Sequence, residues 1–467
     1  MEQYDFIAIG SGMAGYSGAI RAAQMGARVA LVEHRELGGT CLNRGCIPTK
    51  ALIASVEAME KASKGAEFGF HAGDVRPDFA VMMERKRRVA ARLVQGVEQL
   101  IRGHRIVLIR GKGELLSADT VRAAAQDGDE KILKAPKILL AMGSEPARRP
   151  AFGIDGKTVL TSDEALELES PPRSLLIVGA GAIGSEYARF FHACGTEVIM
   201  VEMENQVLPG LDLRLAQALS ARMRKNGIDV RVGSAIQEIR VRPDGAESAL
   251  ANGTTIRTEK VLVSTGRTPN SAGMGLESAG VQVENGFVRT DSRMGTSVPG
   301  LFAAGDLAGK RLLAYTAAKE GVTAAENALG RESSMDYRVV PVTVFSDPEI
   351  ACVGLTEKEA LSQGREIASG LFPFAANGKA LAMDETDGFV CIVSDRQNGE
   401  LLGGQIAGPH ASDLIHEIAL GVGMRIRVKE MASILHSHPT FSEALMEAAL
   451  DVSGEAIHRI RRTGSRG

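Results

Sequence analysis

The sequence lacks a long hydrophobic run, is poor in cysteine and carries no large excess of charge of either sign. Its longest apolar stretch, at residues 175–184, is too short to span a bilayer and is soon followed by Glu186. A net charge of −3 gives no indication of binding to nucleic acid or to an anionic membrane. Five cysteines in 467 residues are too few for a disulfide scaffold, and an apolar strand stands where a secretory signal would begin. We therefore expect a cytoplasmic protein.

Tryptophan is absent as well, whereas glycine is abundant. The 53 glycines predict many tight turns and close approaches between backbone segments. With 44% apolar and 24% charged residues, the composition is typical of a globular protein, and the length predicts about three domains.

A dinucleotide-binding pattern lies at the start of the chain. Apolar runs at 4–9 and 28–32 predict two strands, and a small-residue stretch at 16–25 predicts a helix between them. The turn after the first strand contains Gly10, Gly12 and Gly15, and the second strand ends at Glu33. These are the glycines and the acid that a dinucleotide site needs. The glycines let the backbone approach a pyrophosphate at the helix N-terminus, and Glu33 can accept a hydrogen bond from a ribose hydroxyl.

The same pattern recurs at a constant offset of 169 residues. The first set, Gly10, Gly12, Gly15, Gly26 and Glu33, maps onto Gly179, Gly181, Gly184, Gly195 and Glu202. We interpret this repeat as two separate dinucleotide sites rather than one site and a decayed copy, because the second set is intact. Glu202 indicates NAD at the second site, since a carboxylate accepts from a free ribose hydroxyl and repels a 2′-phosphate.

The two copies of the repeat share a second feature further along the chain. Apolar residues 138–141 run into Gly143, and residues 261–264 run into Gly266, which predicts the last strand of each nucleotide-binding unit and an exit toward another domain. From residue 341 onward, β-rich hairpins mixed with helices predict a separate α+β domain.

Two of the five cysteines, Cys41 and Cys46, stand five positions apart on either side of Gly45, with Pro48 beyond. In a regular helix their Cα atoms would be about 8 to 9 Å apart, and a disulfide tolerates no more than about 7 Å. A bond between them requires a bent backbone, which glycine and proline permit. A redox pair is the favoured reading; two free thiols in a loop, or zinc ligands, are the alternatives.

Two nucleotide sites and one dithiol suggest electron transfer between a thiol, a tightly held flavin and a nicotinamide. The combined motifs resemble the pyridine nucleotide–disulfide oxidoreductases of class I, and within them the members that oxidise dihydrolipoyl groups with NAD⁺. The resemblance covers essentially the whole chain and rests on residues 39–50, both glycine patterns, Gly305-Asp306, and residues 372–408 and 436–443.

The resemblance implies an α/β fold with two Rossmann-like dinucleotide-binding domains and a C-terminal α+β dimerisation domain. The implied boundaries are 1–148 for FAD binding, 149–270 for NAD binding, 271–340 for a central domain that completes the FAD site, and 341–467 for the interface of a homodimer. The implied substrate is a lipoyl-bearing protein or free dihydrolipoamide, in a 2-oxoacid dehydrogenase or glycine cleavage complex.

The family pattern also implies roles for the cysteine segment. Cys41 would exchange with the dithiol substrate and Cys46 would lie against the flavin. Lys50 would sit near the reactive flavin nitrogen, with Glu186 as its partner. From pattern alone, Lys50 could equally be a solvated lysine and Glu186 an ordinary helix-surface acid.

His438 would be the base that reaches the cysteine pair of a partner subunit, with Glu443 orienting it. Glu443 also stands three residues after Thr440, the spacing of a helix cap, which is the alternative. His436 and His438 alternate on an extended segment, so we expect only one of them to be catalytic.

The residues that the resemblance places against FAD or NAD are Gly10, Gly12, Gly15, Glu33, Gly39, Thr40, Lys50, Gly113, Ala141, Gly143, Asp306, Leu313, Ala314, Gly179, Gly181, Ile183, Gly184, Glu202 and Gly266. Among them, Asp306 would bind the ribityl chain of the flavin. No metal ligand is expected.

Three positions depart from the usual family pattern, namely Tyr315, Met142 and Arg44, and the last places a charge between the two cysteines. Glutathione reductase is disfavoured by Glu202, and mercuric reductase by the lack of any cysteine after Cys391. A flavoprotein that serves mainly as a binding component of a multienzyme complex is disfavoured by the intact cysteine pair and His438.

Overall fold

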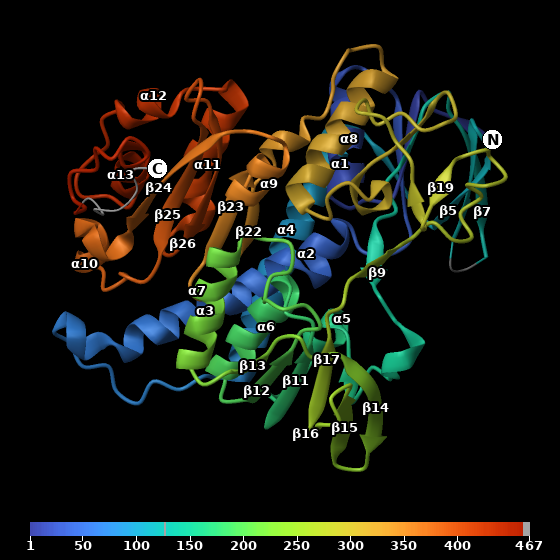
Figure 1. Ribbon diagram of the computed structural model, residues 1–467. Coiled ribbons are helices and arrows are strands. Elements are labelled where there is room, and N and C mark those ends of the chain that lie inside the picture. The colour runs from blue at the N-terminus through green and yellow to red at the C-terminus, as the bar shows by residue number, and fades with distance from the viewer. Residues whose placement is uncertain (126–127, 461–467) are drawn as a thin grey trace. The chain divides into compact units, whose positions relative to one another are not determined.

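A computed structural model describes residues 1–125 and 128–460, and no helix within these residues is long and apolar enough to cross a membrane. The chain forms two compact units (Figure 1). The first contains residues 1–150, 154–170 and 265–335, and the second contains residues 151–153, 171–264 and the chain from Asp336 onward. Each unit combines sheets with covering helices, which confirms the predicted α/β class.

A five-stranded parallel sheet forms the centre of the first unit. Its order is β21 (Leu301–Ala303), β8 (Ile138–Leu140), β2 (Phe6–Ile9), β3 (Val29–Glu33) and β4 (Val107–Arg110). Every residue of β2 and β3 is buried, as expected for parallel strands that are covered on both faces. The predicted strands at 4–9 and 28–32 are therefore confirmed within two residues.

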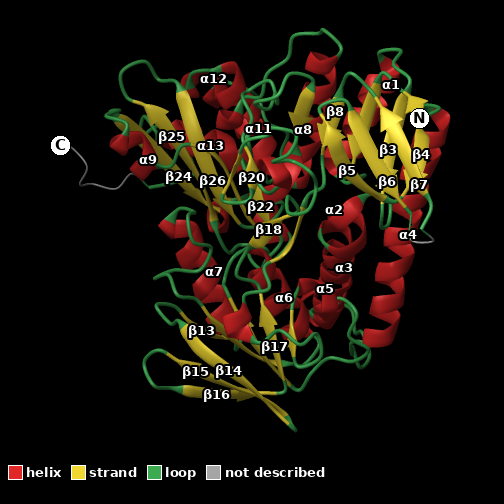
Figure 2. Cartoon of the chain, turned by 90° about the vertical axis from the view of Figure 1, so that its right-hand side faces the viewer, coloured by secondary structure: helices red, strands yellow, loops and turns green. Residues whose placement is uncertain are grey.

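Helices α1 (Met13–Gln24) and α8 (Ala314–Ala328) pack against each other in this unit. A Cβ atom on Gly321 would lie 2.1 Å from the Ala14 carbonyl oxygen, so the two helices approach more closely than any larger residue allows. A short helix, α2 (Gly39–Arg44), precedes two long ones, α3 (Cys46–Ser63) and α4 (Phe79–Gly103), which lie side by side (Figure 2).

A second, four-stranded sheet shares a hydrophobic core with the parallel one. Its order is β1 (Glu2–Gln3), β7 (Glu130–Lys134), β6 (Thr120–Ala124) and β5 (Lys112–Ser117). The first unit also contains α5 (Ser162–Ala165), η3 (Gly305–Ala308), and the antiparallel pairs β9 (Ser144–Pro146) with β18 (Arg267–Pro269) and β19 (Val283–Glu284) with β20 (Phe287–Val288).

The second unit begins with the repeated nucleotide-binding fold. Its parallel strands follow the order β17 (Lys260–Val263), β11 (Ser174–Val178), β12 (Glu197–Val201) and β13 (Asp229–Arg231). Helices α6 (Ala182–Ala193) and α7 (Leu213–Lys225) connect these strands, and β14 (Ile236–Arg242), β15 (Gly245–Leu250) and β16 (Thr255–Thr258) form a separate antiparallel sheet. Both copies of the sequence repeat thus fold as strand, glycine turn, helix and parallel strand.

The C-terminal part of this unit is an antiparallel sheet with helices on both faces. Its strand order is β22 (Val342–Val344), β23 (Ile350–Gly354), β26 (Leu401–Ala407), β25 (Phe389–Asp395) and β24 (Ile367–Pro373). The helices are α9 (Glu357–Ser362), α10 (Gly378–Ala382), α11 (Ala411–Met424), α12 (Val428–Ala432) and α13 (Glu443–Asp451). Helices α11 and α13 pack on one face, where the hydrophobic core lies as the predicted α+β arrangement requires, and α9 packs against Val393 and Leu402 on the other. Residues 461–467 of the predicted dimerisation domain lie outside the described residues.

Two details differ from the sequence prediction. The sequence predicts a helix from about Ala51, and in the structure this helix begins earlier, at Cys46. The basic run at 85–88 predicts a solvated helix face, but this face is not solvated throughout: Lys86 is only 3% exposed and donates to the Leu166 carbonyl oxygen. This face of α4 packs against neighbouring segments, so the Leu166 carbonyl oxygen and the Glu167 carboxylate, the latter 3.0 Å from Lys86 Nζ, satisfy the cation.

Candidate functional site

The cysteine segment is broken at Gly45, as a contact between the two thiols requires. Helix α2 ends at Arg44 and α3 begins at Cys46. The Gly45 carbonyl oxygen accepts hydrogen bonds from the Thr49 backbone N–H at 3.1 Å and from the Thr49 hydroxyl at 2.8 Å. A Cβ atom on Gly45 would lie 3.1 Å from the Thr40 carbonyl oxygen, which is tighter than usual van der Waals contact. The break therefore favours glycine.

Cys41 and Cys46 are not joined by a disulfide bond in this structure, and their side chains interact directly. A hydrogen bond with Cys46 and burial raise the pKa of the Cys41 thiol, while the charge of Lys50 opposes this shift. Cys46 is the first residue of α3, where the partial positive charge of a helix N-terminus favours a thiolate. The two sulfur atoms therefore stand in different electrostatic environments. Among the described residues, no group of three or more His, Cys, Asp or Glu side chains is arranged to hold a metal ion.

The first glycine turn forms a cradle that side chains would fill. Gly10 has a φ of +95°, and a Cβ atom there would lie 2.3 Å from the Ala141 carbonyl oxygen. A Cβ atom on Gly15 would lie 1.7 Å from the Gly10 carbonyl oxygen, and one on Gly39 would lie 2.7 Å from the Gly12 Cα. Gly12 is the N-cap of α1, so unsatisfied backbone N–H groups face this cradle. The geometry fits the pyrophosphate of a dinucleotide.

Glu33 ends β3 as a buried carboxylate, 5% exposed. It accepts hydrogen bonds from the Ser11 backbone N–H at 2.8 Å, the Ser11 hydroxyl at 2.7 Å and the Arg35 backbone N–H at 2.7 Å. Burial raises the pKa of Glu33, but the hydrogen bonds from His34, Arg35 and Ser11 outweigh it and lower the pKa to about 2. The acid is therefore held in place and charged, as a ribose-binding carboxylate must be. Sequence reasoning missed Ser11, whose position inside the glycine turn was its only signal.

The second glycine turn repeats this geometry in the other unit. Gly179 has a φ of +100°, and a Cβ atom there would lie 2.7 Å from the Ser264 carbonyl oxygen. A Cβ atom on Gly184 would lie 2.0 Å from the Gly179 carbonyl oxygen. Gly181 is the N-cap of α6, and Ile183 lies in the first turn of that helix.

Glu202 closes the second turn as Glu33 closes the first. It accepts from the Ala180 backbone N–H at 2.8 Å and from the Glu204 backbone N–H at 3.0 Å. These donors stand at the same offset of 169 residues from Ser11 and Arg35. Both predicted ribose-binding acids therefore have the same backbone anchors.

Asp306 lies in the 3₁₀ turn η3 after strand β21. The Ser144 hydroxyl donates to Asp306 Oδ2, and the Gly305 backbone N–H donates to Glu320 Oε2 at 2.7 Å. Sequence reasoning did not single out Ser144 or Glu320, because contacts across more than ten residues leave no local pattern. The turn that presents Asp306 is thus anchored on two sides.

The other predicted cofactor residues occupy turns and helix starts. Gly113 is on β5, where a Cβ atom would lie 2.7 Å from the Ile9 Cγ2 atom. In the first unit, Thr40 lies in α2, Gly143 (φ +70°) precedes β9, Gly266 (φ +114°) precedes β18, Leu313 caps α8 and Ala314 begins it. Gly266 therefore lies in a different unit from the second glycine turn.

Lys50 and Glu186 are in different units, and their predicted pairing stays a prediction. Lys50 follows Cys46 by four residues on α3, so the two side chains share one face of that helix. Glu186 lies on α6, is buried, and accepts from the Phe345 backbone N–H at 3.1 Å. It is therefore not an ordinary surface acid.

His438 and Glu443 are in direct contact. His438 Nδ1 lies 2.9 Å from Glu443 Oε1, and the Thr440 backbone N–H donates to Glu443 Oε2 at 2.8 Å. Burial raises the pKa of Glu443, but the bonds from Thr440 and His438 outweigh it and lower the pKa. One carboxylate thus orients the imidazole and also binds a backbone N–H beside α13. The His438 side chain is 78% exposed, whereas His436 is tucked against Glu417 at 3.0 Å.

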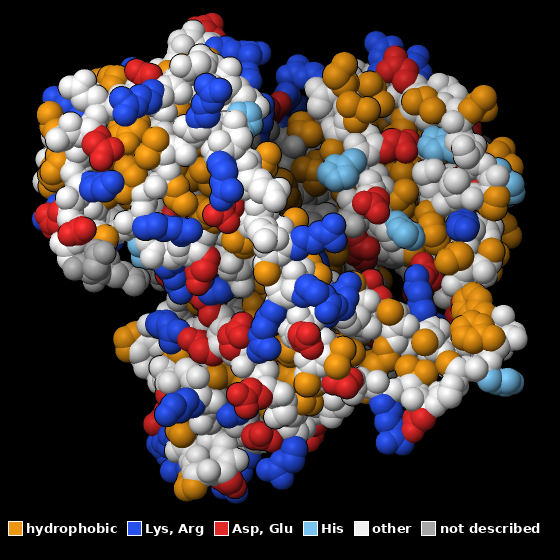
Figure 3. Space-filling model, turned by 180° about the vertical axis from the view of Figure 1, so that it is seen from behind, with side chains coloured by type: hydrophobic (Ala, Val, Ile, Leu, Met, Phe, Trp, Pro, Cys, Tyr) orange, Lys and Arg blue, Asp and Glu red, His pale blue; other side chains and the backbone are white. Residues whose placement is uncertain are grey.

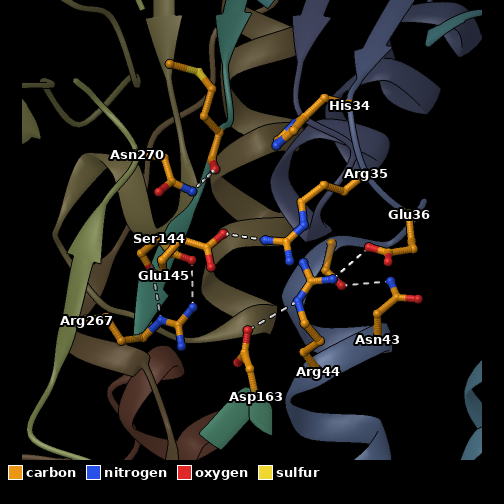
Figure 4. Close-up of polar contacts among 12 residues, drawn as sticks. His34, Arg35, Glu36, Asn43, Arg44, Ser144, Glu145, Asp163, Arg267 and Asn270 are labelled. Carbon is orange, nitrogen blue, oxygen red and sulfur yellow. Dashed lines mark hydrogen bonds and ion pairs between the residues drawn. The ribbon is translucent and has the colours of Figure 1, made fainter. Parts of the chain in front are cut away.

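The Arg44 side chain points toward two carboxylates, those of Glu36 and Asp163 (Figure 4). Its Nη1 donates to Glu36 Oε2 at 2.7 Å, and its Nε lies 3.5 Å from Asp163 Oδ2. Its charge is therefore largely compensated. Of the other two departures from the family pattern, Tyr315 is exposed and Met142 is half-buried.

Comparison with known proteins gives a consistent result over nearly the whole chain. Residues 4–321 match the pyridine nucleotide-disulphide oxidoreductase family, and residues 340–449 match the dimerisation domain of the same family. A dihydrolipoyl dehydrogenase of Bacillus subtilis is 38% identical over 470 residues, which cover 98% of this chain and 99% of the relative. Dihydrolipoyl dehydrogenase 2 of Haloarcula marismortui is 41% identical, over 97% of this chain and 98% of the relative.

Solved structures agree with this assignment. LpdA from Mycobacterium tuberculosis superimposes with a TM-score of 0.91 at 29% identity, over 96% of this chain and 99% of that one. The flavoprotein disulfide reductase RclA from Escherichia coli, solved as a Cu(II) complex, gives a TM-score of 0.87 at 26% identity over the same shares of the two chains. The chain belongs to the pyridine nucleotide–disulfide oxidoreductase family.

Proposed function

We propose that the protein oxidises dihydrolipoyl groups to lipoyl groups and transfers the electrons to NAD⁺ through the Cys41–Cys46 pair and FAD. The substrate dithiol loses two electrons and two protons; NAD⁺ takes up a hydride, and one proton is released. The observation that carries the proposal is the helix break at Gly45, which brings the two cysteine side chains together. The two dihydrolipoyl dehydrogenases that match nearly the full chain support this choice of substrate.

Thiol–disulfide exchange assigns different tasks to the two cysteines. A substrate thiolate attacks Cys41 of the oxidised pair, a mixed disulfide forms, and Cys46 leaves as a thiolate. The second substrate thiolate then attacks the mixed disulfide, which releases the lipoyl disulfide and the Cys41 thiolate. The N-terminus of α3 stabilises the leaving Cys46 thiolate, because leaving groups of lower pKa depart faster.

His438 takes the protons from the substrate thiols. Glu443 accepts from Nδ1, which leaves Nε2 as the basic nitrogen and stabilises the imidazolium that forms. We propose that the cysteine pair served by this histidine belongs to a partner subunit.

FAD fits the first glycine turn, which offers an open cradle, a charged acid at Glu33 and a second acid at Asp306. Bound there, FAD would supply the two-electron redox chemistry that links the dithiol to NAD⁺. Lys50 would supply a cation beside the flavin, and Glu186 is its proposed partner.

We propose NAD rather than NADP for the second turn because Glu202 is fixed as an acceptor by two backbone N–H groups. The four domains set out above, with boundaries at 148, 270 and 340, and a cytoplasmic location belong to the same proposal.

A homodimer is proposed from the dimerisation-domain match at residues 340–449. Large hydrophobic side chains of this region are exposed, with Leu435 at 97%, Met424 at 70% and Leu420 at 66%. Figure 3, which views the molecule from behind, shows hydrophobic side chains (orange) beside histidines (pale blue) on that face. Such side chains are typical of surfaces that become buried on association.

The test is an assay of the purified protein with dihydrolipoamide and NAD⁺, beside glutathione with NADPH. Turnover of dihydrolipoamide with NAD⁺ is expected. A reduced lipoyl-bearing domain, supplied in place of free dihydrolipoamide, should also be oxidised. Turnover of glutathione alone would replace the proposal with a glutathione-reductase-like function. Absence of any turnover would leave a flavoprotein that acts as a binding component.

The cysteine pair has a matched control in the same chain. Cys46→Ser should lose more than 99% of the dithiol activity yet retain FAD, because one thiol cannot cycle through a disulfide. Cys194→Ser, at a buried thiol whose pKa burial raises to about 11, should retain activity. Measurements of the 450 nm flavin absorbance and of turnover check both variants.

A further inference from the structure

We propose that Arg267 is a positioning residue of the FAD site: it fixes Asp306 through the hydroxyl group of Ser144. The inference rests on the proposed role of Asp306 in binding the ribityl chain, and it assigns a function to an arginine that the catalytic cycle does not use.

Arg267 points at Ser144 (Figure 4) and also lies near Asp306. Its Nε donates to the Ser144 hydroxyl at 2.6 Å and its Nη2 donates to the Ser144 carbonyl oxygen at 2.7 Å. The same Nε lies 3.5 Å from Asp306 Oδ2. The Arg267 side chain is only 13% exposed, so water screens these contacts weakly.

The chemistry of a hydroxyl group sets the direction of this relay. Ser144 Oγ has one proton, and a guanidinium can only donate. Because Ser144 accepts from Arg267, its own proton is free to point at Asp306 Oδ2, where the structure places it. Ser144 is buried, so the hydroxyl has few competing partners in solvent. Arg267 therefore determines both where Asp306 sits and which of its oxygen atoms is occupied.

The backbone beside Asp306 is held independently of the relay. The Gly305 N–H donates to Glu320, which is fully buried on α8. The Asp306 side chain remains 22% exposed, which leaves acceptor capacity for a ribityl hydroxyl. The relay thus acts on the side chain, whereas Glu320 acts on the turn.

A purely structural role for Arg267 is the rival explanation, since its two bonds to Ser144 also tie β18 to β9. The two roles predict different ligand dependence. A positioning role affects only ligands that contain a ribityl chain. If the role is structural, the substitution should lower the affinity for every ligand of the pocket, including ADP, which would occupy only the end near Glu33.

The test measures FAD affinity by serial dilution of the holoenzyme, with the fluorescence of released FAD as readout, and repeats the titration with ADP as competitor. For Arg267→Met we expect the Kd for FAD to rise about 10- to 100-fold, the loss typical of a charged hydrogen bond. The Kd for ADP should change by less than about twofold. Arg267→Lys should lie between, because it keeps the charge but not the planar fork.

Two further variants keep the proposal testable. Ser144→Ala removes the relay while Arg267 remains, and should also weaken FAD but not ADP. Arg21→Met breaks another partly buried arginine–carboxylate pair, with Glu326, between α1 and α8, and should leave both affinities within about twofold. In an Asp306→Asn background, Arg267→Met should have a much smaller effect on FAD.

Equal losses of FAD and ADP affinity in Arg267→Met would overturn the proposal in favour of a structural pin. Unchanged FAD affinity in both Arg267→Met and Ser144→Ala, or additive effects of Arg267→Met and Asp306→Asn, would also overturn it. None of these readouts depends on turnover of dihydrolipoamide, so failure here is distinguishable from failure of the proposed function.

Discussion

Glu33 and Glu202, the proposed ribose acceptors of the two glycine turns, are both fixed by backbone N–H groups. Glu33 has an additional donor, the Ser11 hydroxyl, where the second copy has Ala180. The first acid therefore accepts at least one more hydrogen bond than the second, which agrees with the proposal that FAD stays bound at the first turn and NAD⁺ leaves the second after each cycle.

The low pKa of Glu33 predicts a pH-dependent contribution to stability. Folding lowers the pKa of this carboxyl group from 4.5 to about 2. Its ionised form therefore stabilises the folded protein fully at a pH above the pKa of the unfolded state, and this stabilisation is lost as the pH falls through the pKa of the folded state. The stability difference between the native protein and Glu33→Gln should therefore be about 1 kcal/mol smaller at pH 3.5 than at pH 6. Urea unfolding at the two pH values measures it. A difference that does not change with pH would contradict the assignment.

Glu202 should decide which nicotinamide nucleotide is used. In the double variant Glu202→Ala, Met203→Arg, the ribose acceptor is lost and a cation for a 2′-phosphate is gained at an exposed position. The kcat/KM for NAD⁺ should fall about 10- to 100-fold while that for NADP⁺ rises. Steady-state kinetics with both nucleotides check this, and an unchanged NAD⁺ value would show that Glu202 does not contact the ribose. FAD content, which depends on Glu33, should stay constant.

At the scale of elements, the glycine turns were predictable because tight turns constrain both spacing and residue type. The segments that run into Gly143 and Gly266 were also predicted as strands, and they form β8 and β17; the segments after the two glycines pair as β9 and β18. The start of α3 at Cys46 was not predictable, because Pro48 is compatible with either a loop or the first turn of a helix.

Contacts between distant segments account for the remaining differences. Lys86 carries the same charge as its solvated neighbours, and only the packing of α4 buries it. Arg267 meets Ser144 across 123 residues, so no local pattern could have indicated the pair. Sequence reasoning found the residues that a turn or a motif requires, and missed those that only the packing of separate elements brings together.

Because the glycine turn occurs twice, the same substitution can be made in each copy and its effects on FAD and on NAD⁺ compared. Gly15→Ala places a methyl group against the Gly10 carbonyl oxygen, and Gly184→Ala places one against the Gly179 carbonyl oxygen. We expect the first variant to lose most of its FAD. The second should keep its FAD but show a kcat/KM for NAD⁺ at least about tenfold lower, since each clash distorts one helix start.

Flavin absorbance and NAD⁺ kinetics separate these two outcomes. Gly96→Ala is the matched control, because it lies in α4 with open space around the new methyl group and should change neither property. Loss of FAD in Gly184→Ala would show that the two turns do not act as separate sites.

For the whole molecule, the proposed base His438 and the proposed redox pair Cys41–Cys46 belong to different compact units of the chain. His438 is held by Glu443 but its ring is mostly exposed, so the basic nitrogen faces a surface of the second unit. Because the surrounding region matches a dimerisation domain, a second subunit that covers this surface would complete the site.

Mixed dimers test whether each site combines two subunits. Cys46→Ser and His438→Gln homodimers should both be nearly inactive, since one lacks the dithiol and the other lacks the base. In a mixed dimer, one site unites the intact cysteine pair of one subunit with the intact histidine of the other, so it recovers half of the native activity. After the two variants exchange subunits at equal amounts, half of the dimers are mixed, and roughly a quarter of the native activity should return.

Turnover measured before and after subunit exchange, with mixed dimers isolated by two different affinity tags, decides the outcome. If base and dithiol came from the same subunit, every site in a mixed dimer would lack one of them and no activity would return. A mixture of Cys46→Ser with Cys41→Ser is the control. It can form dimers equally well, yet no site in it contains an intact cysteine pair, so recovery there would point to contamination rather than to a shared site.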